Sequence, residues 1–350
     1  MNSKIKTVII GASGYTGIEL IRLLLNHKKV EITALVANSN AGQEISDIYS
    51  HLSNFPLPKL SKLEEVNFSN VDLAFCCLPH TTSQEVIKSL FEGNKYPNLK
   101  IIDLSADFRL KDIDNYKKWY AKDHIAPKIQ HGAVYGLSEL NRDRIKSSNL
   151  IACPGCYPTS ILLPLVPLVK NSLIEESIII DSKSGVSGAG RSLKLGNLYC
   201  EAANSVKAYS VCSHRHTGEV EQELSIVAGK EIQVNFTPHL IPMKRGIITT
   251  TYVTLKEGFK IDNIEHCLET AYEDEYFVNF VKNSDISTSD VYGTNFCKIA
   301  VFPARESNKA VLISVIDNLT KGSSGQAVQN MNIIFGFDDR EGLEILPIFP

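Results

Sequence analysis

The sequence predicts a two-domain α/β protein, with a doubly wound parallel sheet in the first domain and an α+β second domain built on a mostly antiparallel sheet. Its 350 residues suffice for two domains of ordinary size. Over the first half, short apolar runs alternate with amphipathic stretches, which is typical of βαβ units. The later apolar runs are longer, more widely spaced and more alternating, which favours antiparallel strands.

Each expected element follows from its hydrophobic pattern. In the first half we expect a helix over residues 16–25, which has one apolar face, and strands at residues 6–10, 31–37, 73–78 and 101–104. In the second half we expect strands at residues 177–181, 247–255 and 310–316. A late stretch, residues 323–336, begins with Ser and Gly and has the apolar periodicity of a helix.

The composition excludes several classes of protein. Apolar residues make up 43% and charged residues 21%, as in an ordinary globular protein. The formal net charge is −3 with scattered basic residues, which argues against a partner that is nucleic acid or a membrane surface. The sequence shows neither a signal peptide nor a membrane-spanning run. Eight cysteines without a secretion signal indicate free thiols and a cytoplasmic location.

A glycine loop, GASGYTG, connects the first expected strand to the first helix. Glycines in this context let the backbone turn tightly and approach a pyrophosphate at the helix N-terminus. The pattern predicts a Rossmann-type domain that binds a dinucleotide, although a tight turn without a ligand would have the same glycines. The expected cofactor-binding residues of the loop are Gly11, Ser13, Gly14, Tyr15, Thr16 and Gly17.

The end of the second expected strand bears on the choice of dinucleotide. An NAD enzyme usually has an acidic residue there, which binds the ribose 2′-hydroxyl. Here Asn38, Ser39 and Asn40 follow the strand, so no carboxylate repels a 2′-phosphate. Asn38 and Ser39 are therefore expected at the cofactor, and NADP is the expected dinucleotide, although no arginine stands nearby in the sequence.

Cys156 is the candidate nucleophile. It lies in the segment ACPGCYPTS, directly before a long apolar run that we expect to be helical. At a helix N-terminus the macrodipole and the unpaired N–H groups stabilise a thiolate and lower the pKa of the thiol. The same N–H groups stabilise an oxyanion that forms when the thiolate attacks a carbonyl.

Other interpretations of the pair Cys153 and Cys156 remain open. Half of a zinc site would need a second Cys or His pair at metal spacing, which the sequence does not supply, so no metal is expected. In a thioredoxin-like redox protein the CxxC motif follows the first strand directly, whereas here it comes after several βα units. The remaining alternative is an inert buried thiol, which fits the surroundings of Cys76, Cys77, Cys200, Cys267 and Cys297.

The segment HRHTGE, residues 214–219, precedes a plausible helix. We expect His216 to act as general acid and base, Thr217 to cap the helix, and Glu219, one turn on, to orient the His216 ring. His214 is expected to line the substrate or solvent. Taken alone, the triplet HRH at residues 214–216 would also fit a solvated surface segment.

These motifs together resemble the N-acetyl-γ-glutamyl-phosphate reductase family of arginine biosynthesis, which is related to aspartate-semialdehyde dehydrogenase. The resemblance covers essentially the whole chain, and nine segments occur in the family's order. They are GASGYTG from Gly11, CLPH ending at His80, DLSADFRL at 103–110, YGLSELNR at 135–142, CPGCYPTS around Cys156, SGVSGAGR at 184–191, HRHTGEVEQEL from His214, TPHLIPMKRGI at 237–247 and DNLTKGSSGQAVQNMN at 317–332.

The resemblance implies the domain organisation and the reaction. Residues 1–155 and 323–350 are expected to form the NAD(P)-binding Rossmann-like domain, and residues 156–322 the catalytic α+β domain through which subunits associate. The implied reaction is the NADPH-dependent reduction of N-acetyl-L-glutamyl 5-phosphate to the 5-semialdehyde, with release of phosphate, through a thioester on Cys156. The expected assembly is a homo-oligomer, a tetramer or a dimer.

Further site residues follow from the resemblance and from side-chain chemistry. Arg109 is expected to bind the phosphate, because its planar guanidinium suits oxyanions, although an ion pair with Asp107 is the alternative. The other residues expected at the substrate are Ser184, Gly185, Arg215 and Arg245. The other residues expected at the cofactor are Pro79, Ser187, Gly188, Gly325 and Gln326.

Two positions depart from the family pattern. Ser39 stands where the family often has an arginine, and Gly218 stands where it commonly has proline. Three alternatives stay open: a sister enzyme acting on aspartyl or aminoadipyl phosphate, a dinucleotide-binding regulatory protein without catalysis, and a CxxC metal-binding module. The HRHTGE segment favours the N-acetylglutamyl enzyme over the aspartyl one.

Overall fold

The computed structural model describes residues 4–282 and 284–348 and divides the chain into two compact units. The first unit comprises residues 1–154 with 323–344, and the second comprises residues 155–322 with 345–350. The boundary near the C-terminus therefore differs from the expected one, because residues 345–348 belong to the second unit. There the Ile348 N–H donates to the Tyr292 carbonyl at 3.1 Å.

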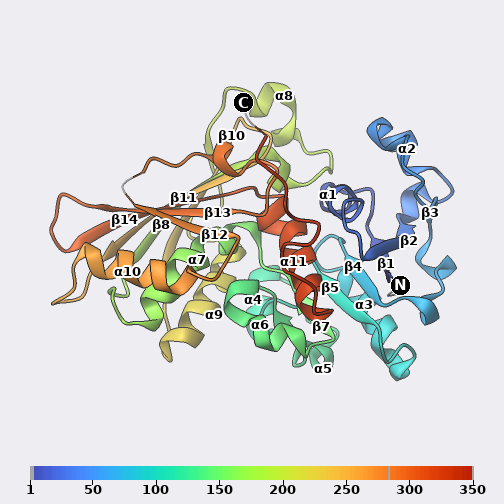
Figure 1. Cartoon of the computed structure of the whole chain (residues 1–350), viewed down its shortest axis with the longest axis horizontal. Coiled ribbons are helices and arrows are strands. Elements are labelled where there is room, and N and C mark those ends of the chain that lie inside the picture. The colour runs from blue at the N-terminus through green and yellow to red at the C-terminus, as the bar shows by residue number, and fades with distance from the viewer. Residues whose placement is uncertain (1–3, 283, 349–350) are drawn as a thin grey trace. The chain divides into compact units, whose positions relative to one another are not determined.

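A seven-stranded sheet with strand order β3-β2-β1-β4-β5-β7-β6 forms the first unit, and all of its described pairings are parallel (Figure 1). Its strands are β1 (Ile5–Ile10), β2 (Val30–Val36), β3 (Leu60–Ser61), β4 (Leu73–Cys76), β5 (Lys100–Asp103), β6 (Val134–Tyr135) and β7 (Leu150–Ala152). The helices are α1 (Tyr15–Leu24), α2 (Ile45–Ile48), α3 (Ser83–Phe91), α4 (Ile113–Tyr120), α5 (Pro127–Gln130), α6 (Ser138–Lys146) and α11 (Gly325–Ile334).

Helix α11 returns the end of the chain to the first unit. It packs against α1, α6 and strand β5, and most of its side chains are buried. The prediction of a helix at this point is confirmed. The Ser324 hydroxyl donates to the Thr16 carbonyl at 2.9 Å, so the start of α11 is tied to the start of α1.

The second unit contains another seven-stranded sheet, with strand order β12-β13-β14-β11-β8-β10-β9. Its strands are β8 (Ile178–Gly185), β9 (Lys207–Ala208), β10 (Val234–Ile241), β11 (Ile247–Thr254), β12 (Val278–Lys282), β13 (Cys297–Pro303) and β14 (Lys309–Ile316). The sheet is mixed, so the expectation of a mostly antiparallel sheet is wrong. Strand β10 pairs with β8 in parallel, and β12 pairs with β13 in parallel. A parallel pair needs a crossover connection, and α9 (His216–Ala228) lies in the one between β8 and β10.

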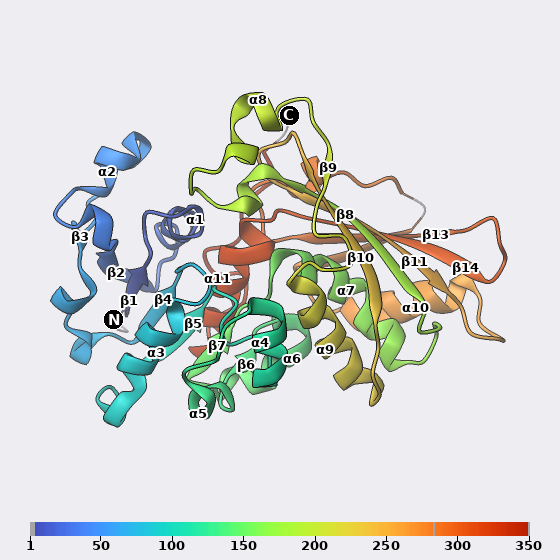
Figure 2. The ribbon, with the colours of Figure 1, turned by 180° about the vertical axis from the view of Figure 1, so that it is seen from behind.

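Helices α7 (Cys156–Lys170), α9 and α10 (Ile261–Tyr272) lie on the same side of this sheet in both views (Figures 1 and 2). The short helix α8 (Tyr199–Ala202) lies apart from them. On β8, Ile178 and Ile180 are buried, whereas Ile179 between them is 49% exposed. The sheet therefore buries one face and presents apolar side chains on the other. Among the described residues, no helix is long and apolar enough to cross a membrane.

Helix α7 is buried along almost its whole length although it contains Pro164 and Pro167. Each proline lacks the N–H that would bond the carbonyl four residues earlier, which leaves the Ser160 and Leu163 carbonyls without their helical donors. Side chains from neighbouring elements supply the missing donors. The Ser314 hydroxyl donates to the Ser160 carbonyl at 2.6 Å, and the Tyr272 hydroxyl donates to the Leu163 carbonyl.

Because the Tyr272 hydroxyl replaces a missing helical donor, its removal should lower the stability of the chain. Tyr272→Phe should lower the free energy of unfolding by about 1–3 kcal/mol, because the buried Leu163 carbonyl loses its donor. In Tyr272→Phe/Pro167→Ala, a new backbone N–H at position 167 can take over that bond, so part of the stability should return. Denaturant unfolding of the single and double variants measures both effects, with Tyr199→Phe on the surface as control. Equal stabilities of Tyr272→Phe and the wild type would contradict the interpretation.

Candidate active site

The start of α7 presents Cys156, as predicted from its position before the apolar run. Gly155 is the N-cap residue, with φ −65° and ψ 153°, and it has no side chain with which to cap the helix. Its backbone N–H instead donates to Glu219 Oε1 at 2.7 Å. Glu219 lies in the first turn of α9 and is buried. A carboxylate from one helix therefore fixes the first turn of the other, beside a half-buried thiol.

His216, the first residue of α9, packs its ring against Gly155. A Cβ atom at position 155 would lie 2.6 Å from His216 Nε2 and 2.7 Å from Cε1. The backbone at Gly155 would accept alanine, so it is the imidazole that requires glycine here. The structure thus brings the imidazole to the residue that precedes Cys156 and joins Cys156, His216 and Glu219 into one cluster.

His214 is half-buried among aromatic rings, and its assignment to the substrate or solvent stays a prediction. Its ring lies edge-on to the rings of Tyr157, Tyr209, His216 and Phe236, with centroids 4.8–5.7 Å away. Its Nδ1 accepts the backbone N–H of His216 at 3.2 Å. Burial, followed by the nearby charge of Arg215, lowers the pKa of His214 to about 4. His214 is therefore a neutral ring that fixes the start of α9.

The cap of α9 also differs from the expected one. Arg215, not Thr217, is the N-cap residue, and its own side chain makes no capping hydrogen bond. The Thr217 N–H bonds the His214 carbonyl at 2.9 Å, and Thr217 itself is buried. His214 Nδ1 performs the function expected of the Thr217 hydroxyl. Arg215 is exposed, which leaves its guanidinium accessible to an anionic substrate.

The glycine-rich segment after β8 contacts the segment that precedes β11. Val186 N donates to the Met243 carbonyl at 2.9 Å, and Ser187 N donates to the Lys244 carbonyl at 3.1 Å. A Cβ at position 185 would lie 2.8 Å from the Arg245 nitrogen, so glycine permits this close approach. Gly185 thereby lies against Arg245, Ser187 bonds the residue before it, and a Cβ at Gly188 would lie 3.1 Å from the Ser184 hydroxyl oxygen.

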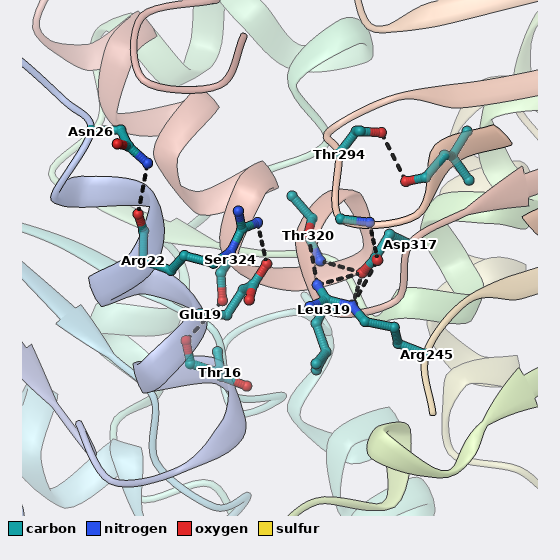
Figure 3. A network of polar contacts seen from close by, with 12 residues as sticks. Thr16, Glu19, Arg22, Asn26, Arg245, Thr294, Asp317, Leu319, Thr320 and Ser324 are labelled. Carbon is teal, nitrogen blue, oxygen red and sulfur yellow. Dashed lines mark hydrogen bonds and ion pairs between the residues drawn. The ribbon is translucent and has the colours of Figure 1, made fainter. Parts of the chain in front are cut away.

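Arg245 forms an ion pair with the fully buried Asp317 (Figure 3). Its Nε lies 2.7 Å from Asp317 Oδ2, and its Nη2 donates to Asp317 Oδ1 at 2.8 Å and to the Thr320 hydroxyl at 2.9 Å. Asp317 also accepts the N–H groups of Leu319 and Thr320. One edge of the guanidinium is therefore committed to ordering the 317–322 segment.

The 317–322 segment reaches Cys156, the candidate nucleophile, at its far end. A Cβ at Gly322 would lie 2.8 Å from Cys156 Cβ and 3.2 Å from Cys156 Cα. Asp317 and Gly322 were not singled out from the sequence, although both lie in the segment DNLTKGSSGQAVQNMN. Its Asp and Gly residues were the available signal, but the partner positions 156 and 245 are far away in the chain.

Arg109 lies in the first unit, in the loop after β5 and not at the end of a strand. It is 6% exposed. Its Nε donates to the Cys153 carbonyl at 2.6 Å, and its Nη2 donates to the Leu104 carbonyl at 3.0 Å. These bonds fix the backbone after β5 and β7. Its assignment to the phosphate stays a prediction.

Cys153 is buried, and Asn330 Nδ2 approaches its sulfur at 3.6 Å. Burial raises the pKa of its thiol to about 12, although the Asn330 hydrogen bond and the charge of Arg109 act against this. Both Cys153 and Cys156 are free thiols. Within the described ranges, no group of three or more His, Cys, Asp or Glu residues is arranged to hold a metal ion.

The glycine loop has the geometry of a dinucleotide site. Gly11 has φ +90°, and a Cβ there would lie 2.5 Å from the Cys77 carbonyl oxygen. A Cβ at Gly17 would lie 2.5 Å from the Gly11 carbonyl oxygen, so glycine lets α1 approach β1 closely. Gly14, the N-cap of α1, has no side chain to cap the helix. A pyrophosphate suits this helix terminus.

The other expected cofactor residues mostly lie at the same sheet edge. Asn38 and Ser39 form an exposed turn directly after β2, and Pro79 is exposed shortly after β4. Both strands flank β1, whose end carries the glycine loop. In the loop itself, Tyr15 is exposed, whereas the Ser13 and Thr16 carbonyls accept the hydroxyls of Tyr49 and Ser324.

Gln326, unlike the exposed residues Asn38, Ser39 and Pro79, is buried. It lies one residue after Gly325 in α11, and its Nε2 donates to the Gly136 carbonyl at 3.1 Å and to the Ser138 hydroxyl at 2.5 Å. Its amide thus ties α11 to the start of α6. Its assignment to the cofactor stays a prediction.

Comparison with known proteins identifies the family to which the chain belongs. Residues 6–148 match the family model described as the semialdehyde dehydrogenase NAD binding domain, and residues 156–318 match the model described as the semialdehyde dehydrogenase dimerisation domain. A probable chloroplastic N-acetyl-γ-glutamyl-phosphate reductase of Arabidopsis thaliana is 49% identical over 348 residues, which cover 99% of this chain and 86% of that protein. The N-acetyl-γ-glutamyl-phosphate reductase of Rhodospirillum rubrum is 47% identical over the whole of both chains.

Solved structures agree on the fold. Aspartate semialdehyde dehydrogenase II of Vibrio cholerae, complexed with ASA, superposes with a TM-score of 0.73 at 17% identity, covering 96% of this chain and 99% of that one. The aspartate semialdehyde dehydrogenase of Candida albicans with NADP superposes with a TM-score of 0.68 at 16% identity, covering 95% and 99%. At such low identity the superpositions support the shared fold alone.

The half-buried, neutral His214 predicts how the free energy of unfolding depends on pH. Its pKa is about 4 in the folded chain and near 6.5 when unfolded, so only the unfolded chain binds the proton between these values. The wild type should therefore lose about 1–2 kcal/mol of unfolding free energy from this group between pH 7 and pH 5. His214→Asn, which keeps an acceptor for the His216 N–H, should lose correspondingly less.

Urea unfolding at the two pH values measures this difference, and the exposed His51→Asn serves as control. Parallel pH profiles for the wild type and His214→Asn would contradict the assignment.

Proposed function

We propose a role in the reaction for each residue of the candidate site. The chain belongs to the semialdehyde dehydrogenases and, among them, to the N-acetyl-γ-glutamyl-phosphate reductases. The enzyme reduces N-acetyl-L-glutamyl 5-phosphate to N-acetyl-L-glutamate 5-semialdehyde, with release of phosphate, in arginine biosynthesis. The observation that carries the mechanism is the His216 ring against Gly155, the residue before Cys156. A thiol at a helix start beside an imidazole is an arrangement for nucleophilic acyl transfer.

Cys156 attacks the acyl carbonyl as the thiolate. A carbon–sulfur bond forms, the carbon–oxygen bond to phosphate breaks, and phosphate leaves a thioester on the enzyme. The bound nicotinamide supplies the hydride that reduces this thioester. Collapse of the resulting oxyanion breaks the carbon–sulfur bond, releases the semialdehyde and restores the thiolate.

His216 and the first turn of α7 assist these steps. His216 gives a proton to the oxyanion and takes it back when the oxyanion collapses. Glu219 acts through position, because its carboxylate fixes Gly155 and stands one turn from His216 on α9. The backbone N–H groups at the start of α7 stabilise the negative oxygen. Arg215, the exposed N-cap residue of α9, suits the charged parts of the substrate. The other candidates for the substrate are Ser184, Gly185, Arg245 and Arg109.

The first unit fits the dinucleotide that the family uses. The residues expected to bind the dinucleotide are the glycine loop with Tyr15 at the start of α1, the turn of Asn38 and Ser39, and Pro79. Gly11 and Gly17 fit because a Cβ at either position would overlap neighbouring backbone. NADP is favoured over NAD, since residues 37–43 contain no carboxylate to repel the 2′-phosphate.

Association of subunits through the second unit is also proposed. Ile179 on β8 and Tyr252 on β11 are register partners, and they are 49% and 48% exposed. Together they place apolar surface on the uncovered face of the sheet, which favours pairing with a second copy. A dimer formed there, or a tetramer built from it, would be the working form.

A substrate panel tests the proposed function as a whole. N-acetylglutamate, aspartate and aminoadipate semialdehydes are each offered with NADP and phosphate, and reduction of the dinucleotide is followed by its absorbance. We expect turnover with the N-acetylglutamyl compound. Turnover with only one of the others would identify a sister enzyme, and turnover with none would favour a non-catalytic dinucleotide-binding protein.

Cys156→Ser should abolish turnover while NADPH still binds. The serine hydroxyl has no accessible anion near neutral pH, and loss of a covalent nucleophile costs several orders of magnitude in rate. Cys153→Ser should stay active, because burial raises the pKa of the Cys153 thiol to about 12. Steady-state rates and NADPH titrations measure both variants. Retention of more than about a tenth of the wild-type turnover in Cys156→Ser would exclude the thioester route.

NADP should bind more tightly than NAD. Ser39→Asp should reduce or reverse this preference, because the new carboxylate repels the 2′-phosphate and can bind the ribose 2′-hydroxyl. Competitive titration of both dinucleotides against the wild type and Ser39→Asp measures the preference. Equal affinities of the wild type for the two dinucleotides would contradict the proposal and would mean that Asn38 and Ser39 contact only the ribose hydroxyl.

A further inference from the structure

A buried polar cluster in the first unit lies outside the proposed chemistry. Asp103 and Asp107, from the DLSADFRL segment, are both fully buried, and so is Ser83 at the start of α3. The two carboxylates have different partners. Asp103 accepts the Ser105 N–H and hydroxyl, and its Oδ2 lies 3.2 Å from the Ser83 hydroxyl oxygen. Asp107 instead accepts bonds from the backbone of the turn that precedes α3.

Each oxygen of Asp107 receives two donors. Oδ1 accepts the Thr81 N–H at 2.7 Å and the Tyr116 hydroxyl at 2.8 Å. Oδ2 accepts the Ser83 N–H at 3.2 Å and the Ser83 hydroxyl at 3.0 Å. Helix α3 has Thr82 as its N-cap residue and no side-chain cap of its own. Asp107 thus caps α3 from a distant part of the chain.

The turn that Asp107 holds is strained. Thr81 has φ +69°, a left-handed conformation that a β-branched residue rarely adopts. Thr81 therefore needs support from its surroundings. Asp107 accepts its N–H, and Lys122 Nζ donates to its hydroxyl at 3.1 Å. The Thr82 hydroxyl donates to the Pro79 carbonyl at 2.6 Å, so the same turn includes Pro79.

This turn lies at the dinucleotide edge of the sheet. It follows β4, which pairs with β1, and the Cys77 N–H donates to the Ile10 carbonyl at 2.7 Å. The Cys77 carbonyl occupies the space that a side chain at Gly11 would need. In parallel sheets of this kind, ligands bind outside the carboxyl ends of the strands. A change in the turn would therefore alter one wall of the cofactor site.

We propose that Asp107 is a positioning residue for the dinucleotide, because its carboxylate holds residues 79–83 in the conformation that completes the wall beside the glycine loop. The inference rests on the proposed function, since it takes the nicotinamide dinucleotide as the ligand. Asp107 contacts the backbone of the turn, and its effect is exerted through Thr81 and Ser83.

Asp107→Asn tests the role with little change of shape. Asparagine offers one oxygen and one NH2 group, so in either orientation the Thr81 N–H or the Ser83 N–H faces another donor. If the turn is then ordered for only about a tenth of the time, the Kd for NADPH rises about tenfold. The rate at which iodoacetamide alkylates Cys156 in the second unit should not change.

Asp103→Asn is the matched control. Asp103 is equally buried in the same cluster, but it bonds no backbone group of the 79–83 turn. Burial, and then the charge of Asp107, raises the pKa of Asp103 to about 7, so asparagine is a close neutral substitute. The Kd of this variant for NADPH should stay within about twofold of the wild type. An equal rise in Asp103→Asn and Asp107→Asn would overturn the proposal, because the cluster as a whole would then be responsible.

Two substitutions of Thr81 probe the turn itself. Thr81→Gly relieves the strain at positive φ, so it should restore part of the NADPH affinity of Asp107→Asn, which a general loss of stability would not allow. Thr81→Pro removes the N–H and cannot adopt φ +69°, so it should raise the Kd even if Asp107→Asn fails to fold.

Fluorescence titration of the full chain with NADPH measures all of these variants. Wild-type affinity in Asp107→Asn or Thr81→Pro, or no recovery with Thr81→Gly, would overturn the proposal. A wild-type chain that does not bind NADPH would instead refute the proposed function.

Discussion

The hydrogen bond from the Gly155 N–H to Glu219 is the interaction on which the rest of the proposed active site depends. It joins the first turns of two helices that are far apart in the chain, α7 with the thiol and α9 with the imidazole. Gly155 serves both sides of this contact. Its N–H bonds the carboxylate, and its missing side chain leaves room for the His216 ring. The donor, the acceptor and the imidazole ring all belong to the second unit.

The surroundings of this contact resist displacement. Helix α7 cannot shift along the sheet without breaking the bonds by which Ser314 and Tyr272 satisfy its proline-freed carbonyls. At the start of α9 the His216 N–H donates to Nδ1 of His214, whose neutral ring lies among aromatic side chains. Both helices are held near their first turns, so the proposed catalytic residues are positioned without a substrate. Such preorganisation is how enzymes reduce the cost of reorganisation in the transition state.

The parts that the sequence predicted depend on local patterns. Glycines at 11, 14 and 17 and the apolar run after Cys156 act within a few residues, so the dinucleotide loop and the start of α7 could be recognised. The mixed second sheet could not, because Pro238 inside β10 argues against a strand and the parallel pairing with β8 depends on a long crossover. The contacts of Asp317 with Arg245 and of Gly322 with Cys156, and the surroundings of His214 and Gln326, likewise depend on segments that are distant in the chain.

A double-mutant cycle between positions 155 and 216 tests the central claim, that Gly155 is required because the His216 ring occupies the space beside it. Gly155→Ala, His216→Gln and the double variant are compared by kcat/KM with N-acetylglutamate semialdehyde, NADP and phosphate. We expect the double variant to be no slower than His216→Gln alone, because the added methyl group acts by displacing an imidazole that His216→Gln has already removed. Losses that simply multiply would contradict it, because Gly155 would then act independently of His216.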